Sequence, residues 1–352
     1  MQRHTLIERP DHISPRELDD YLAAGWYRIG QTMMTCRFLV FEETLRSTIW
    51  TRLDLRAHSM RKGQRRHLRR LRREITVRSG PVRIDATRER LYQRYRSVAR
   101  GDRSPTLHDF LYEGRHTSLF DTRELSLWRG EELVAFCWFD VGENSLQSLL
   151  GAYEPSEAAL GLGYATLLLE LEWGQEHGYA FHYSGYVMPD EPAMDYKLRA
   201  GQMEFLSQEG QWLPWEDFGP QHDPLVVLTE HLSIARDAML LRGLPAEIID
   251  YKMFEARAYE PGLHRCYEQP RAIESSRSQH GNSTLLVSYN LDTDRYTAIH
   301  AVRAAGFVRP PDPTSPPRRV TLFVEHEAVI SDQTADQLAD ALHARLTGNQ
   351  RW

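Results

Sequence analysis

The spacing of apolar residues predicts one helix and then two strands in the first part of this 352-residue chain. The helix is expected to begin after Ser14, which is followed by a proline and then by Glu17 three residues later, a pattern typical of a capped N-terminus. It is expected to end at Gly25. Residues 37–55 are rich in apolar and β-branched residues, and they predict two strands that turn near Glu42.

The middle of the chain changes from strand spacing to helical spacing and back. Residues 118–155 predict an antiparallel meander with turns near Gly130 and Gly142. Two glycines then precede a helix whose apolar positions recur at helical spacing, namely Tyr164, Leu167, Leu168 and Leu171. Its outer face is expected to carry Glu170, Glu172, Gln175 and Glu176. An aromatic strand, residues 179–186, follows this helix. Strand, glycine-rich turn, helix and strand in this order form the core of the GNAT type of acyltransferase fold.

The last third of the chain predicts a separate mixture of helices and strands. Residues 224–261 are expected to form one or two helices broken near Gly243, residues 283–304 a strand and a helix, and residues 318–346 a strand and a helix. A proline-rich link, residues 309–317, precedes that last pair. The whole chain is therefore expected to be an α+β protein with a GNAT-like mixed sheet flanked by helices. Three regions are expected, residues 1–80 (an N-terminal α+β region), 81–218 (the GNAT-like domain) and 219–352 (an accessory α/β region).

The composition places the chain among ordinary globular proteins of a reducing compartment. Apolar residues make up 41% of it and charged residues 26%. The three cysteines, Cys36, Cys137 and Cys266, are too far apart to predict a disulfide framework or a paired-cysteine metal site. No leader-like N-terminus or membrane-length apolar run is present in the sequence. A cytoplasmic location and no membrane partner are expected.

The net charge of −6 hides a strongly basic segment. Between Arg52 and Arg103 there are 18 cationic residues against five acidic ones, so the rest of the chain carries a net charge of about −19. From Arg56 to Arg73 nine of eighteen residues are cationic, and the first acid after them is Glu74. Such a face repels itself unless an anion lies against it, and a nucleic-acid backbone is one such anion. A basic surface with no specific partner is the alternative interpretation.

The segment YSGYVMPDEPAMDYKLRA, residues 183–200, is too polar to be core although it begins in a buried strand. It contains three tyrosines, three acids and one lysine, which are side chains that exchange protons. One interpretation is a reactive loop beside the helix that starts at Gly161, since free amides at a helix N-terminus stabilise an anion. The other is a solvated loop that covers the edge of the sheet.

Several motifs together resemble one family, the arginyl-tRNA and leucyl-tRNA protein transferases, from about Tyr21 to Phe218. YLAAGWYRIG resembles the family's opening stretch, and MRKGQRRHLRRL is similar to its Gln-Arg-Arg stretch. LGLGYATLLLELEWGQEHGYAFHYSGYVMPDEPAMDYKLRA resembles its Leu-Gly-x-Tyr helix, Tyr-x-Gly-Tyr strand and Pro-x-Met-x-Tyr-Lys loop. The last block matches at the family's spacing through Tyr183, Gly185, Tyr186, Pro192, Met194, Tyr196 and Lys197.

This resemblance implies transfer of an amino acid from aminoacyl-tRNA to an amine, with arginine as the first candidate and leucine as the second. The implied acceptor is a protein N-terminus. The implied catalytic residues are Tyr186, Asp195, Tyr196 and Lys197. Asp195 or Glu191 would receive the ammonium proton, Tyr196 would relay a proton to the ribose, and Lys197 would pair with the terminal phosphate. The implied substrate-binding residues are Gly161, Gly163, Tyr164, Tyr183, Gly185 and Met194. The implied tRNA-binding residues are Arg28, Arg61, Lys62, Arg65, Arg66, Arg69 and Arg70.

Two departures from related patterns bear on cofactors. The family commonly has a cysteine cluster after its opening stretch, but only Cys36 is present here, and one thiolate does not hold a metal or an iron-sulfur unit. The turn used by acetyl-CoA enzymes begins with Gln or Arg, whereas this chain has Ala158 there. No metal and no cofactor are therefore expected. A coenzyme-A-dependent N-acyltransferase and a non-catalytic RNA-binding relative remain as alternatives.

Overall fold

The computed structural model describes residues 4–101, 103–275, 282–308, 318–332 and 334–347. They form two compact units, a larger one made of Ile7–Thr35 and Thr48–Phe218, and a smaller one made of Met1–Leu6, Cys36–Ser47 and Gly219–Trp352. The predicted boundary after residue 218 coincides with a boundary between these units. The predicted boundary after residue 80 does not, because residues on both sides of it belong to one sheet of the larger unit.

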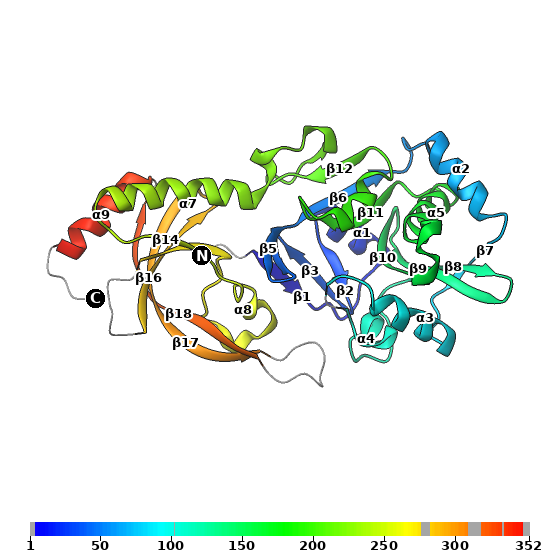
Figure 1. Cartoon of the computed structure of the whole chain (residues 1–352), viewed down its shortest axis with the longest axis horizontal. Helices are drawn as coiled ribbons and strands as arrows, with labels where there is room; N and C mark the ends of the chain where they lie inside the picture. The colour runs from blue at the N-terminus through cyan, green and yellow to red at the C-terminus, as the bar shows by residue number, and fades with distance from the viewer. Residues whose placement is uncertain (1–3, 102, 276–281, 309–317, 333, 348–352) are drawn as a thin grey trace. The chain divides into compact units, whose positions relative to one another are not determined.

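The larger unit is built on an eight-stranded mixed sheet (Figure 1). In spatial order its strands are β13 (Trp212–Pro214), β12 (Met203–Leu206), β6 (Ile49–Asp54), β11 (Phe181–Val187), β10 (Ser145–Tyr153), β9 (Glu132–Val141), β8 (Thr122–Arg129) and β7 (Thr76–Pro81). Strands β10 and β11 run parallel, and the other neighbouring pairs run antiparallel. The predicted meander is β8, β9 and β10, so the expectation of an α+β chain with a mixed sheet is confirmed.

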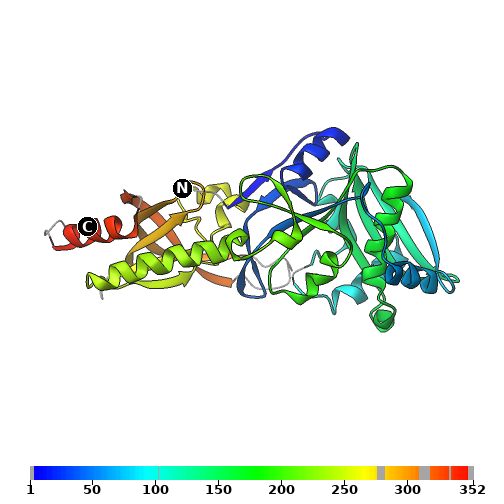
Figure 2. The same ribbon diagram turned by 90° about the horizontal axis from the view of Figure 1, so that it is seen from above.

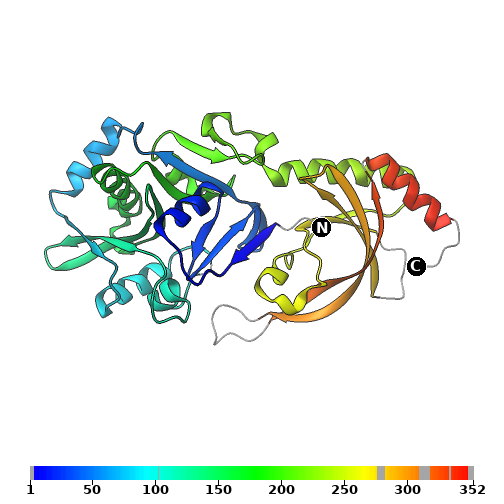
Figure 3. The ribbon, with the colours of Figure 1, turned by 180° about the vertical axis from the view of Figure 1, so that it is seen from behind.

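Helices cover both faces of this sheet. Apolar residues of α2 (Lys62–Leu71) and α5 (Leu162–Glu176) share one hydrophobic cluster with residues of β6, β8, β9, β10 and β12. The opposite face is covered by α1 (Pro15–Ala23), α3 (Ala86–Arg96), α4 (Leu107–Tyr112) and the hairpin of β2 (Tyr27–Ile29) and β3 (Thr32–Cys36). Accordingly α5 lies in front of the sheet in Figure 1, and α1 lies in front of it in Figure 3. The last α-helix of the larger unit among the described residues, α6 (Asp195–Leu198), follows β11 in the sequence.

The predicted ends of α1 are confirmed, because they depend on hydrogen bonds between residues close together in the sequence. Ser14 caps α1, its side chain accepts from the amide of Glu17, and the carboxylate of Glu17 accepts from the amide of Ser14 at 2.7 Å. Gly25 follows the helix with a φ of +76°, a conformation that favours glycine. One expectation for α5 is wrong, because Glu170 is buried in the core instead of lying on the outer face.

The smaller unit contains a five-stranded antiparallel sheet in the order β14 (Glu247–Asp250), β15 (Arg271–Ser275), β16 (Ser283–Asn290), β17 (Arg295–Val308) and β18 (Arg318–Asp332). Its core is completed by α7 (Pro224–Leu241), α9 (Ala335–Thr347) and the hairpin of β4 (Phe38–Phe41) and β5 (Thr44–Ser47). Figure 2 shows α7 lying along these strands. The short helix α8 (Ala256–Tyr259) follows β14, and β1 (Thr5–Glu8) spans the boundary between the units.

Two predictions in this part of the chain need correction. Residues 37–55 form three strands, β4, β5 and β6, with the turn at Glu42 and Glu43, which both have positive φ. The helix expected within residues 283–304 is instead strand β17. Irregularities in its pairing at Ala298/Ile299 and His300/Ala301 put consecutive apolar residues in the core, so the pattern imitates helical spacing. The proline-rich link, residues 309–317, lies outside the described residues.

In the described part of the chain, none of the helices has the length and apolar character required to cross a membrane.

Candidate active site

The parallel strands β10 and β11 separate soon after they begin to pair. Only Ser145 to Gln147 of β10 pair with Phe181 to Tyr183 of β11. Beyond this point the register of β10 on β9 shifts between Ser148 and Leu150, and that of β11 on β6 shifts between Tyr183 and Gly185. The phenol of Tyr27, on β2, donates to the carbonyl of Ser148 at 3.1 Å. Tyr27 is thus bound to β10 just beyond its last residue paired with β11.

The irregularity in β11 decides which side chains share a face. Across the ladder with β6, Tyr183 is opposite Arg52, Gly185 is opposite Thr51 and Tyr186 is opposite Trp50. Ser184 is the extra residue. In a regular strand, residues 183 and 186 would point to opposite faces. The bulge turns Tyr183 and Tyr186 to the same face, as bulges beside functional sites often do.

Gly185 lies against the side chains of two residues, Tyr27 and Lys197. Its φ is +82°, and a Cβ added there would lie 3.2 Å from the ring of Tyr27 and 3.6 Å from Nζ of Lys197. Nζ of Lys197 donates to the carbonyl of Tyr186 at 2.9 Å. The ring of Tyr186 packs edge-on against Trp50, with 5.5 Å between centroids. We call Tyr27, Gly185, Tyr186, Tyr196 and Lys197 the Tyr-Lys cluster.

The surroundings of this cluster shift the proton affinity of its members. Burial lowers the pKa of Lys197 to about 8, the Arg103 guanidinium lowers it as well, and the Glu170 carboxylate opposes both. A larger share of Lys197 is therefore neutral near pH 7 than of an exposed lysine. Burial raises the pKa values of Tyr27 and Tyr196, so both phenols keep their protons and remain donors. One amine that can accept a proton thus lies among phenols that can donate hydrogen bonds.

The loop between β11 and α6 is tied to the segment that follows α3. Glu191 is 2% exposed, and its carboxylate accepts from Nη1 of Arg100 at 2.5 Å and from the amide of Ala193 at 3.3 Å. The expectation that Glu191 receives the substrate's proton needs correction, since its buried carboxylate is paired with the half-exposed Arg100 and holds the loop. Asp195 begins α6 and is exposed. Lys197 also differs from expectation, because it is half-buried against Tyr186.

Three predicted substrate-binding residues have packing or scaffolding roles. Tyr183 is 5% exposed and packs edge-on against Trp212 in the core beside α1. Met194 packs against the apolar cluster of β6, β11 and β12. The hydroxyl of Tyr164 donates to the carbonyl of Arg199 at 2.9 Å and accepts from Gln64 at 2.8 Å. These contacts connect α5, α2 and the segment after α6.

Two glycines at the start of α5 have a different role. Gly161 has a φ of +63° and forms the N-cap of α5 without any capping side chain. A Cβ on Gly163 would lie 3.1 Å from the ring of Tyr153. The first amides of α5 therefore have no side-chain acceptor, which leaves this helix end able to stabilise negative charge.

The basic segment forms α2, which presents its cations outward. Gln64, Leu68 and Leu71 are buried at helical spacing. Six of the predicted tRNA-binding residues are exposed, namely Arg61, Lys62, Arg65, Arg66, Arg69 and Arg70. The seventh, Arg28, is only 2% exposed and forms a buried ion pair with Asp140 at 2.7 Å, so from this position it does not reach a phosphate. Its assignment to tRNA binding needs correction.

Sequence reasoning missed Tyr27, Glu170 and His182. Tyr27 stands beside Arg28 in the opening stretch, which was a usable signal. Glu170 and His182 are each 1% exposed, and Oε2 of Glu170 lies 3.0 Å from Nε2 of His182. In the sequence, Glu170 looks like one of the exposed acids of α5. Only the packing of α5 on the sheet shows that it is buried and paired with His182. Within the described residues, no group of three or more His, Cys, Asp and Glu side chains is arranged to hold a metal ion.

Comparison with known proteins agrees with the motifs in the larger unit. Residues 87–207 match the family model described as "Arginine-tRNA-protein transferase, C terminus". The chain is 29% identical over 115 residues to an "Aspartate/glutamate leucyltransferase" of Leptospira interrogans, covering 31% of this chain and 45% of that protein. A protein of the same name from Methylobacterium nodulans is 29% identical over 212 residues, covering 55% and 82%. The chain spans less than half the length of the first relatives it matches.

Solved structures similar to this chain include the C-terminal domain of a putative lysylphosphatidylglycerol synthetase from Agrobacterium fabrum, at a TM-score of 0.32 and 14% identity, covering 40% of this chain and 47% of that one. A GCN5-related N-acetyltransferase from Kribbella flavida is similar at a TM-score of 0.26 and 12% identity, covering 44% and 53%. The family model covers the strands and helices that carry most of the Tyr-Lys cluster. The similarity of this chain to the arginyl-tRNA and leucyl-tRNA protein transferases therefore includes residues 87–207, which match the family model.

Proposed function

We propose that this chain transfers an amino acid from aminoacyl-tRNA to the free α-amine of a protein or peptide. Arginine is the first candidate, because the matching family model describes arginine-tRNA-protein transferases. Leucine is the second, since the curated relatives are named leucyltransferases. The observation that supports the proposal best is the contact of Tyr27, Gly185 and Lys197 where β10 and β11 separate.

The reaction is the aminolysis of an ester that is already activated. The amine nitrogen attacks the carbonyl carbon at the tRNA 3′ end, a C–N bond forms, and the bond from that carbon to the ribose oxygen breaks. The α-ammonium, with a pKa near 8, first loses one proton to become nucleophilic. The nitrogen loses a second proton as the amide forms, and the ribose oxygen gains one. The chain therefore needs a proton acceptor, a proton donor and a site for one oxyanion.

Lys197 is the proton acceptor in this proposal. A neutral lysine amine is a suitable base for an ammonium of similar pKa, and burial lowers the pKa of Lys197 to about 8. This role replaces the expected ion pair with a terminal phosphate, because the half-buried Nζ already donates to the carbonyl of Tyr186. The phenol of Tyr196, kept protonated by burial, gives its proton to the leaving ribose oxygen and takes the second proton of the attacking nitrogen in return. The uncapped amides at the start of α5 stabilise the oxyanion.

The exposed cations of α2 supply the long-range attraction for tRNA. Six of them lie on one short segment from Arg61 to Arg70, and none is separated from the next by an acid. Contacts between such side chains and phosphates position a nucleic acid without reading its sequence. The acceptor protein or peptide would then approach the Tyr-Lys cluster with its amine.

The direct test is incubation of the full chain with tRNA charged with radiolabelled arginine or leucine and a panel of peptides with different N-terminal residues. Mass spectrometry of the peptides would detect an added residue and identify it. Transfer of either amino acid to a peptide α-amine supports the proposal, and absence of transfer from all charged tRNAs overturns it. A parallel sample with acetyl-CoA tests the coenzyme-A alternative, because acetylated peptide would favour that activity. Stabilisation of the chain by acetyl-CoA would point the same way.

A further inference from the structure

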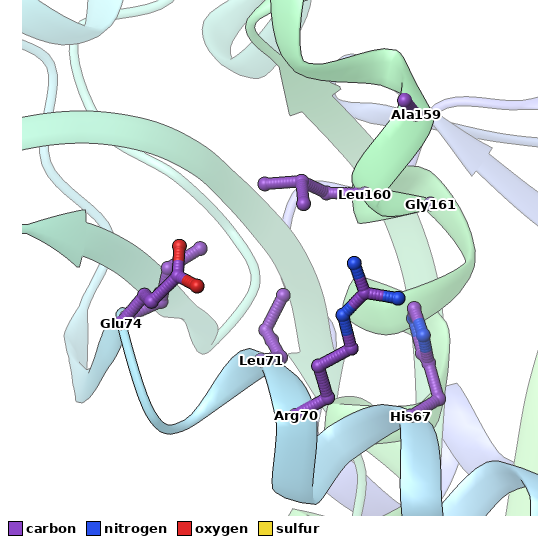
Figure 4. A pocket seen from close by; sticks show the side chains of 8 residues that line it. His67, Arg70, Leu71, Glu74, Ala159, Leu160 and Gly161 are labelled. Carbon is purple, nitrogen blue, oxygen red and sulfur yellow. The ribbon is translucent and has the colours of Figure 1, made fainter.

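A cavity of about 140 Å³ lies between α2 and the turn that leads into α5. Figure 4 shows His67 and Arg70 rising from α2 toward Leu160 and Gly161, with Glu74 on the other side of the same space. Its apolar wall is formed by Leu71, Ile75 and Leu160. At about 30 Å³ for each water in the liquid, the cavity has room for one small ring with its substituents.

The lining argues against a simple anion site. Arg70 and His67 favour an anion, but the carboxylate of Glu74 lines the same cavity and opposes one. Apolar side chains on one wall do not bind phosphate oxygens either. A flat, polar heteroaromatic ring suits this combination better, because its faces are apolar and its edge carries donors and acceptors.

We infer that this cavity binds a cytosine base of the single-stranded tRNA 3′ end, and this inference rests on the proposed function. The edge of cytosine presents an exocyclic amine that donates, beside a ring nitrogen and a carbonyl that accept. Glu74 can accept from the amine, as carboxylates do in reading cytosine, and Arg70 can donate to the two acceptors. The His67 ring, which lies beside Tyr164, lines the cavity and can stack on the base, as is common in recognition of unpaired RNA bases.

Arg70 and Glu74 are exposed at the mouth of the cavity, Glu74 within electrostatic range of Arg129, and the ring of His67 lies 6.3 Å from that of Tyr164. No hydrogen bond or ion pair of the Arg70 or Glu74 side chains with another described protein group is present, and Nε2 of His67 is buried without a hydrogen-bond partner. His67 lies close to the start of α5, since its Cε1 is 3.3 Å from the position of a Cβ on Gly161.

Helix α2, which forms one wall of the cavity, is hydrogen-bonded to the segment that follows α6. Gln64, one turn before Leu68 on α2, donates to the carbonyls of Arg199 and Ala200 at 3.1 and 2.8 Å. These two residues directly follow α6, which carries Lys197. A base in the cavity would therefore belong to a nucleotide adjacent to the aminoacylated end. All elongator tRNAs present cytosine at those positions, so a cytosine site serves any charged tRNA.

The test measures binding of cytidine and uridine 5′-monophosphate to the full chain by titration calorimetry. The two probes carry the same phosphate, but uracil has a carbonyl where cytosine has its amine. We expect cytidine monophosphate to bind about fivefold or more tightly, the range for one base-edge contact pair. Glu74→Gln should remove this preference, and Ala159→Trp, which fills the cavity from an exposed position, should abolish binding of both. Glu176→Gln, an exposed carboxylate near the end of α5, is the matched control and should bind like the unchanged chain.

Equal binding of the two nucleotides, or binding that survives Ala159→Trp, would overturn the inference. Preferential binding of adenosine 5′-monophosphate would also overturn it and would favour a coenzyme-A nucleotide. The transfer assay separates this inference from the proposed function. If Glu74→Gln and Ala159→Trp leave the rate of transfer from charged tRNA unchanged, the cytosine site alone is contradicted. Cytosine-selective binding in a chain that transfers nothing would contradict the proposed function alone.

Discussion

Nζ of Lys197 donates a hydrogen bond of 2.9 Å to the main-chain carbonyl of Tyr186, eleven residues earlier in the chain. This bond joins α6 to the end of β11 and holds the only lysine of the Tyr-Lys cluster beside Gly185. It also explains why Lys197 is half-buried although the segment that carries it is polar. A charged or neutral amine can make this bond, so the contact is compatible with a change in protonation during the reaction.

Replacing Lys197 with Met should lower single-turnover transfer about a hundredfold or more, because a lost acid-base group commonly has that effect. The melting temperature should change little, since the buried amine is exchanged for an apolar side chain of similar length. Lys252→Met, the same change at an exposed position of the smaller unit, is the control and should retain normal transfer. A normal rate for Lys197→Met would show that another group accepts the proton.

The pH dependence of transfer should move when Glu170 loses its charge. The Glu170 carboxylate raises the pKa of Lys197, so Glu170→Gln should lower that pKa further below 8 and populate the neutral amine at lower pH. The rising part of the rate profile should therefore shift toward acid, whereas the acceptor amine, being the same peptide, titrates as before. Glu172→Gln, on the same helix but partly exposed and paired with Arg72, should leave the profile unchanged. A profile unaffected by Glu170→Gln would remove Lys197 as the titrating base.

Gly185→Ala should destabilise the larger unit and impair transfer. A non-glycine residue at a φ near +80° costs about 1 to 2 kcal/mol, and here the new methyl group would also press on the Tyr27 ring at 3.2 Å. Gly210→Ala is a matched control, because Gly210 has a φ of +78° with no atom within 4 Å of the added Cβ. The difference between the two variants in free energy of unfolding, measured with denaturant, gives the cost of the contact with Tyr27. Equal losses of stability would mean that Tyr27 moves aside without cost.

The basic helix α2 should determine the salt dependence of tRNA binding. Changing Arg65, Arg66, Arg69 and Arg70 together to Ala should weaken binding, and loss of the phosphate contacts of Arg65, Arg66 and Arg69 should flatten the plot of log affinity against log salt by about 0.7 to 0.9 each. A variant that loses four exposed cations of the smaller unit, at Lys252, Arg265, Arg303 and Arg319, controls for net charge. An unchanged slope in the α2 variant would show that tRNA contacts another surface.

Glu255 should make the smaller unit less stable as the pH rises. Burial raises the pKa of Glu255 to about 7, so the folded state holds a proton that the unfolded state releases near pH 4.5. Between these values the folded state binds more protons, and stability falls with increasing pH until the slope vanishes above about 7. Glu255→Gln should remove this contribution. Melting temperatures at pH 5 and pH 8 for both chains would test it, and an identical pH dependence in the variant would contradict it.

The sequence by itself determined the features that depend on neighbours along the chain. The cap of α1 uses Ser14 and Glu17, and the outward cations of α2 follow from the helical spacing of Gln64, Leu68 and Leu71. The Tyr-x-Gly-Tyr strand and the Tyr-Lys loop were also recognisable, since their residues are close together in sequence. These signals were sufficient for the α+β class and for the family.

Only the tertiary structure decided the environment of each reactive group. Arg28 reads as a surface cation, but its pairing with Asp140, 112 residues away, buries it. From the sequence, Glu170 is expected on the solvated face of α5. The packing of α5 on the sheet instead places it beside His182. The bulge at Ser184 lies in the pairing of β11 with β6, a strand from much earlier in the chain, and it brings Tyr186 to the same face as Tyr183. Burial and strand register arise from contacts between distant segments, and the sequence of one segment does not contain them.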